Sequence, residues 1–177
     1  MRFFKSTNRI ASLWADALRF HGHSCPLLAL GVRVCDTALT RLCLEEAKPG
    51  RLVCVSEFDG CCVDAIQTGL HCTTGTKHLL FYKTGKLVFT VYDLESGGSV
   101  RMVCGSDLAD TIREMEPEAV LSAPEDMLFT FEQAHPLTRK TLDKVRGTCS
   151  SPAPAVPHRI SGVQDSPDQF RKFDTAN

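Results

Sequence analysis

Three side chains of the kind that bind metals stand two residues apart in one short stretch, at His21, His23 and Cys25. Imidazole nitrogen and thiolate sulfur are the donors that zinc and similar borderline metals take in proteins. Gly22 lets the chain bend between the two histidines, so that three ligands from a single loop can reach one ion. A run of this kind also arises by chance between two helices, so a metal site inferred from this stretch alone is a hypothesis.

A second group of reactive side chains follows a predicted strand and comprises Cys61, Cys62 and Asp64, with Cys72 a short helix further on. Loops at strand ends suit functional sites because a rigid scaffold presents their side chains. A helix followed by a returning strand leaves both loops at one end of the domain. We therefore expect Cys61 and Cys72 to join the first loop as metal ligands, whereas Cys62 is better explained as a small buried residue.

Asp64 and Cys61 are the candidate catalytic residues. Asp64 could orient a ligand histidine through a hydrogen bond or act as a base, and the alternative is a carboxylate that caps the start of a helix. The remaining cysteines before residue 105 lie in apolar helix or strand patterns and are expected in the core: Cys35, Cys43, Cys54 and Cys104.

The elements that must position these residues begin with two helices. Apolar residues at three- and four-residue steps predict a helix over residues 8–20. A second helix is predicted from about residue 26 to residue 46, with Ser24 as its cap and Pro26 as its first residue. The short, apolar and β-branched run over residues 52–55 predicts a buried strand that leads to Cys61.

The rest of the domain is predicted to contain further strands and helices. Strands are predicted near residues 79–82 and 87–92, with a hairpin turn at Thr84-Gly85, and a further strand over residues 100–103 after Gly97-Gly98. Helices are predicted over residues 106–115 and up to about Arg146. The fold class expected is α+β, with a mostly antiparallel sheet packed with helices.

Length and composition fit one domain. The chain has 177 residues, 43% of them hydrophobic, which predicts a single core domain over residues 1–146 and a Pro- and Ser-rich arm over residues 147–177. With a net charge of -1, the chain lacks the excess of positive charge that is typical of proteins that bind nucleic acid. Without an apolar segment of membrane length or a signal peptide, we expect a soluble, cytoplasmic protein, in which an odd number of cysteines favours thiols and metal over disulfides.

Several of these motifs, in this order, resemble those of the FmdE family, which takes its name from formylmethanofuran dehydrogenase. The likeness covers roughly residues 9–105 and rests on Phe20-His-Gly-His-Ser-Cys-Pro, Leu30-Gly-Val-Arg, Cys61-Cys-Val-Asp-Ala-Ile-Gln, Cys72-Thr-Thr-Gly and Gly85-Lys-Leu-Val-Phe-Thr-Val-Tyr. The resemblance implies an α+β core domain that forms a homodimer and holds a metal, zinc, with the histidines and cysteines of these motifs.

The sequence departs from the family pattern in two places. Many members end in a zinc-ribbon module with two Cys-x-x-Cys pairs, whereas this chain has only Cys149 in its arm. Thr76-Lys77-His78 stands where the family often has Lys-Gly-Asn. We therefore expect the FmdE-like core domain without the C-terminal zinc ribbon.

Two functions follow as hypotheses. The first is a zinc-dependent enzyme that acts on a small molecule through an open coordination position. The alternative is an accessory or maturation protein that carries a metal or cofactor to a molybdenum or tungsten enzyme such as formylmethanofuran dehydrogenase. A purely structural zinc site would instead need four tight protein ligands and no open position.

Overall fold

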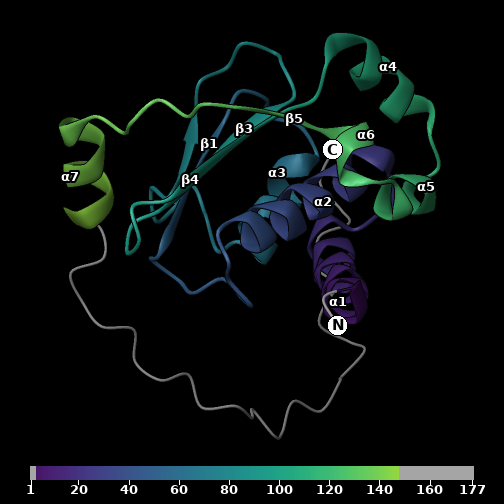
Figure 1. Cartoon of the computed structure of the whole chain (residues 1–177), viewed down its shortest axis with the longest axis horizontal. Helices are drawn as coiled ribbons and strands as arrows, with labels where there is room; N and C mark the ends of the chain where they lie inside the picture. Colours follow the sequence, from purple (N-terminus) through teal and green to yellow (C-terminus); the bar gives the residue numbers. More distant parts are fainter. Residues whose placement is uncertain (1–2, 148–177) are drawn as a thin grey trace, which may run out of the picture.

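The computed structural model describes residues 3–147. Five strands form one sheet and helices surround it, which confirms the expected α+β class (Figure 1). In chain order the elements are α1 (Phe3–His21), α2 (Pro26–Arg41), β1 (Leu52–Ser56), α3 (Cys62–Gly69), β2 (Leu79–Phe81), β3 (Val88–Asp93), β4 (Ser99–Val103), α4 (Ser106–Glu114), α5 (Pro117–Ser122), α6 (Glu125–Leu128), β5 (Thr130–Glu132) and α7 (Arg139–Gly147).

The strands lie in the order β2-β1-β3-β4-β5. All neighbouring pairs are antiparallel except β1 and β2, which run parallel and are joined by α3. The predicted hairpin at Thr84-Gly85 is therefore wrong as a strand pairing, because β1 lies between β2 and β3. Gly85 does turn the chain there with a positive φ of 80°, and Gly97, with φ of 74°, makes the true hairpin between β3 and β4.

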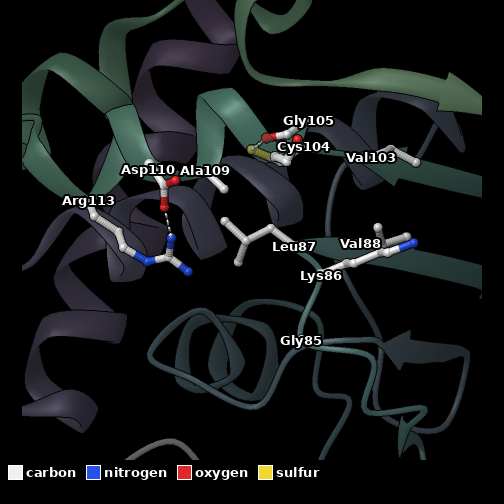
Figure 2. Close-up of a pocket in the computed structure, with 11 residues that line it drawn as sticks. Gly85, Lys86, Leu87, Val88, Val103, Cys104, Gly105, Ala109, Asp110 and Arg113 are labelled. Atoms are coloured by element: carbon white, nitrogen blue, oxygen red, sulfur yellow. Dashed lines mark hydrogen bonds and ion pairs between the residues drawn. The ribbon is translucent and has the colours of Figure 1, made fainter.

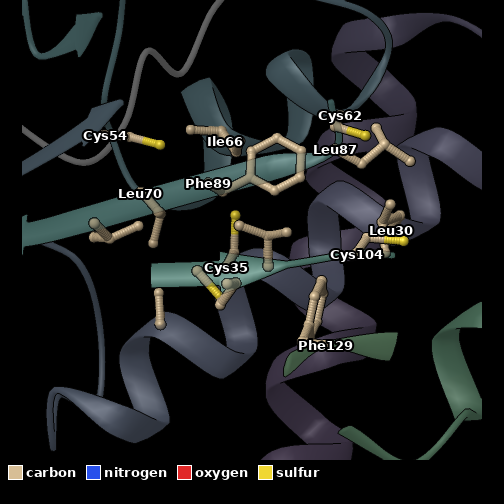
Figure 3. Close-up of a cluster of buried hydrophobic side chains, with 14 of the residues drawn as sticks. Leu30, Cys35, Cys54, Cys62, Ile66, Leu70, Leu87, Phe89, Cys104 and Phe129 are labelled. Atoms are coloured by element: carbon tan, nitrogen blue, oxygen red, sulfur yellow. The ribbon is translucent and has the colours of Figure 1, made fainter. Parts of the chain in front are cut away.

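The hydrophobic core lies between the sheet and helices α2 and α3. Alternate residues of the strands point into it, among them Phe89 and Met102, both fully buried. Figure 3 shows the sulfurs of Cys35, Cys54 and Cys104 among these apolar side chains. Three of the four cysteines assigned to the core are thus buried as predicted.

The fourth, Cys43, is exposed, and this corrects the prediction that α2 continues to residue 46. The helix ends at Arg41, and Cys43 takes a left-handed conformation with φ of 58°. The Leu44 N–H then reaches back to the Leu39 carbonyl at 2.8 Å, which closes the helix end as in a Schellman motif. A left-handed residue at this place is usually glycine, so the sequence carries no ordinary stop signal.

The opposite face of the sheet carries Thr90, Tyr92 and Arg101. In Figure 1 α7 lies on this side, to the left of the strands, and α2 and α3 lie to their right. The Tyr92 hydroxyl donates to the His135 carbonyl at 2.7 Å, which ties the segment before α7 to this face. The expected arm over residues 147–177 lies outside the described residues from residue 148 onward, and no described helix is long and apolar enough to cross a bilayer.

Candidate metal centre

The loop between α1 and α2 is built to hold three donors close together. The Gly22 N–H bonds to the Leu18 carbonyl at 2.9 Å, and the positive φ of Gly22, 87°, turns the chain directly after His21. The predicted cap Ser24 is wrong by one residue: Cys25 is the N-cap of α2, and its sulfur accepts the Leu28 N–H at 3.4 Å. A sulfur at a helix N-terminus is well placed for negative charge, as a metal-bound thiolate requires.

This loop brings the two histidines and Cys25 together. One ligand atom from each of His21, His23 and Cys25 lies within 4.8 Å of the other two. His21 Nε2 and Cys25 Sγ are 3.9 Å apart, and the two imidazole rings lie 4.2 Å apart between centroids. His23 is exposed while His21 and Cys25 are half-buried, so the group opens toward solvent at His23.

Asp64, from the first turn of α3, fixes the orientation of the first histidine. Its Oδ2 lies 2.7 Å from His21 Nδ1, and Gln67 Nε2 donates to its other oxygen at 3.4 Å. With the Nδ1 proton held by this carboxylate, the Nε2 lone pair of a neutral His21 faces Cys25. The hydrogen bonds of the Asp64 carboxylate thus go to the side chains of His21 and Gln67, although Asp64 does lie in the first turn of α3, as the capping interpretation expected.

Cys61, the residue before α3, lies beside the same group. Cys61 and Cys25 pack against the same small apolar cluster of Ala17, Leu28, Val32 and Ala65. The pKa of Cys61 is raised by burial first, and then by its hydrogen bond to Cys25 and the negative charge that Cys25 can carry. The structure thus brings Cys61 to the first loop, next to Cys25.

Cys72 lies elsewhere. It is fully buried in the core, where its thiol donates to the Leu52 carbonyl at 3.3 Å. Burial raises the pKa of Cys72 to about 12. Cys72 belongs to the main core, and not to the small apolar cluster against which Cys25 and Cys61 pack. Cys62 is likewise fully buried, as the packing interpretation predicted. We therefore leave Cys72 out of the ligand set that we propose below.

A glycine that the sequence reasoning did not single out allows α2 and α3 to meet here. A Cβ on Gly31 would lie 2.5 Å from the Cys62 carbonyl oxygen and 2.7 Å from Cys62 Cα. Only glycine permits this approach, which brings Asp64 and Cys61, at the start of α3, close to Cys25, the N-cap of α2. A glycine inside an apolar helical pattern was the available signal for this contact.

The spacing of the three donors suits a borderline divalent metal such as zinc. Two nitrogen or sulfur ligands of one zinc ion are about 3.3–3.8 Å apart, given bonds of about 2.0–2.3 Å. The observed 3.9 Å between His21 Nε2 and Cys25 Sγ, and the 4.8 Å limit for the whole group, require only small side-chain movements. The distances between these three residues therefore allow one divalent metal ion to be bound by all of them.

Comparison with known proteins identifies the family of this chain. Residues 20–130 match the family described as FmdE, molybdenum formylmethanofuran dehydrogenase operon, and the chain belongs to this family. A protein of Archaeoglobus fulgidus named as a probable S-adenosyl-L-methionine-binding protein is 31% identical over 104 residues. The matched part is 56% of this chain but 28% of that relative. The chain is thus an FmdE-family protein with a candidate His/Cys metal centre.

Proposed function

We propose that this FmdE-family protein binds one zinc ion through His21, His23 and Cys25 and uses it to act on a small molecule. The observation that supports this is the approach of three donor atoms to within 4.8 Å of one another on a loop that is exposed at His23. A structural zinc site is normally closed by four protein ligands, whereas a catalytic site keeps one position for water or substrate. Since His23 is exposed, an open position on that side of the group would be accessible to water or substrate.

A zinc ion held in this way supplies Lewis-acid chemistry at its open position. The residues around it have separate tasks. Asp64 accepts a hydrogen bond from the Nδ1–H of His21, which holds the ring in place and strengthens its Nε2 as a metal ligand. Cys61, whose raised pKa keeps its thiol protonated in the metal-free protein, is the residue beside Cys25 that can donate a proton or become a fourth ligand.

The accessory function remains as a second candidate, because the family description itself links FmdE to the operon of a molybdenum enzyme. In that function the metal would be carried and released, so Cys61 would close the site as a fourth ligand and exchange with a partner. The same ligands serve both candidates, and the openness of the loaded site distinguishes them. The homodimer implied by the family resemblance, and the cytoplasmic location, stay predictions.

The first experiment measures zinc stoichiometry and affinity by competition with a chromophoric chelator. We expect one equivalent of zinc in the natural protein, strong loss of occupancy in Cys25→Ser, and affinity lowered about 10–100-fold in Asp64→Asn, the usual effect of removing a carboxylate behind a ligand histidine. Cys43→Ser is the matched control, because Cys43 is an exposed cysteine outside the group. Full occupancy in Cys25→Ser would refute the proposed site.

The second experiment replaces zinc with cobalt(II), whose absorption spectrum reports thiolate ligands and coordination number. Azide should change the spectrum of the natural protein if one position is open, which supports the enzyme. If the spectrum shows two thiolates and azide leaves it unchanged, the fourth position is filled by Cys61, and the carrier function replaces the enzyme. Cys61→Ser should then restore the response to azide.

A further inference from the structure

Two cysteines from the starts of different helices meet beside the proposed metal centre. Cys25 is the N-cap of α2 and Cys61 is the N-cap of α3, and the close contact of these helices at Gly31 brings the start of α3 to α2. The side chain of Cys61 is hydrogen-bonded to that of Cys25, and both pack against the same small apolar cluster. The two sulfurs are therefore neighbours in the folded chain.

Both sulfurs can also be reached from solvent, because Cys25 and Cys61 are only half-buried. Cys43 is exposed, but it follows the far end of α2, roughly 24 Å from Cys25 at a rise of 1.5 Å per residue. Cys104 is buried, and its thiol donates to the Gly105 carbonyl at 3.8 Å in the wall of a hollow beside α4 (Figure 2). The other cysteines of residues 3–147 are fully buried: Cys35, Cys54, Cys62 and Cys72.

A peroxide can oxidise two such thiols to a disulfide in two steps. In the first, a thiolate attacks one oxygen of hydrogen peroxide; the O–O bond breaks, a sulfenic acid forms and hydroxide leaves. Cys25 is favoured as this thiolate, because its sulfur accepts the Leu28 N–H at 3.4 Å at the N-terminus of α2. In the second, the Cys61 thiol attacks the Cys25 sulfur, and its proton leaves with the sulfenic hydroxyl as water. Two thiols and one peroxide thus become one disulfide and two waters.

We propose that Cys25 and Cys61 are joined by a reversible disulfide when the protein meets peroxide, and that this disulfide releases the metal. The metal release rests on the proposed zinc site, in which Cys25 supplies the thiolate among the three ligands. A disulfide sulfur has lost the thiolate charge that binds the metal, and the bond also occupies Cys61, the candidate fourth ligand. His21 and His23 then remain, whereas zinc sites normally have three or four protein ligands. A dithiol reductant restores both thiols by exchange.

The first test asks whether the disulfide forms, and it needs no metal. Metal-free protein is treated with one equivalent of hydrogen peroxide, and mass spectrometry of its unreduced peptides locates the link. We expect Cys25 linked to Cys61, and dithiothreitol should separate the two peptides. Cys43→Ser is the control and should give the same link, whereas Cys61→Ser should give none. The proposal is overturned if no link forms, or if Cys25 is linked to another cysteine such as Cys62 or Cys149.

The second test follows the metal in zinc-loaded protein with an excess of peroxide, with a chromophoric chelator to report zinc release. The natural protein and Cys43→Ser should lose their zinc and bind it again after dithiothreitol is added. In Cys61→Ser the Cys25 sulfur lacks its partner and is oxidised further to sulfinic acid, which dithiothreitol does not reduce, so zinc binding should not recover. Circular dichroism checks that each variant is folded.

Two results of this second test would overturn the proposal. The natural protein could keep its zinc although the disulfide has formed, or Cys61→Ser could recover zinc binding as fully as the natural protein does. If the untreated protein binds no zinc, the proposed function fails and the metal release fails with it. The peptide map of the metal-free protein then still decides whether Cys25 and Cys61 form the disulfide, so the two failures can be told apart.

Discussion

Replacing Gly31 with alanine should loosen the fold and the metal centre together. A Cβ at Gly31 would lie 2.5 Å from the Cys62 carbonyl oxygen and 2.9 Å from Ala65 Cβ, whereas ordinary contact begins at 3.4 Å. The helices α2 and α3 must then separate by about 0.9 Å at this point, and such overpacking costs about 1–3 kcal/mol. Alanine regains about 1 kcal/mol through its higher helix propensity. The expected net loss is about 0–2 kcal/mol in the free energy of unfolding.

The same displacement reaches the metal centre, because Asp64 lies on α3 only two residues after Cys62. A shift of about 0.9 Å lengthens the 2.7 Å contact between Asp64 Oδ2 and His21 Nδ1 beyond hydrogen-bond range. Zinc affinity should therefore fall toward that of Asp64→Asn. Urea unfolding and chelator competition on Gly31→Ala measure the two effects, with Gly75→Ala as control, because nothing lies within 4 Å of a Cβ there. Unchanged stability and affinity in Gly31→Ala would refute the close contact of the two helices.

Two further predictions concern the buried thiols and the acid range. With a thiol reagent in the folded protein, Cys43 should react fast, while Cys35, Cys54, Cys62 and Cys72 should react only on unfolding; fast labelling of Cys72, located by mass spectrometry, would contradict its place in the core. Asp93 accepts two hydrogen bonds from Arg51, at 2.9 and 2.7 Å, which hold the pKa of Asp93 well below its usual range. Its contribution to stability is complete above the unfolded pKa of about 3.9 and is lost as the pH falls below it. Urea unfolding should therefore show that the free energy of unfolding falls less between pH 5 and pH 3 in Asp93→Asn than in the natural protein. Asp16→Asn, at an exposed carboxylate, is the control. Equal losses in Asp93→Asn and Asp16→Asn would refute the assignment.

Local sequence patterns predicted the features that depend on local physics. The apolar period of α1 and the proline at the start of α2 are properties of a few consecutive residues, and both elements formed close to the predicted places. The spacing of His21, His23 and Cys25 likewise placed three donors on one loop, because so short a segment cannot separate them widely. The antiparallel character of β3 and β4 followed from the Gly97-Gly98 turn.

Long-range placement could not be predicted in this way. Cys61 and Cys72 flank the same short helix and look alike in the sequence, yet Cys61 lies next to Cys25 and Cys72 lies under the sheet. The difference arises because β1 pairs with both β2 and β3, and a pairing between distant strands leaves no local signal. The end of α2 was missed for a different reason. Cys43 has a left-handed backbone conformation, and glycine is the residue that usually occupies such a position and so marks the end of a helix in the sequence.

The contact between His21 and Asp64 also has a consequence for how the protein opens. It joins the last residue of α1 to α3, and α1 packs mainly on α2 and α3 at the edge of the fold. A helix at such an edge can detach in local openings that leave the central strands intact. A metal that binds only when His21 is docked opposes this opening by about 2.7 kcal/mol at a free concentration one hundred times its dissociation constant. Amide exchange in α1 would then slow as the free metal concentration rises, even under conditions where global unfolding is too rare to contribute.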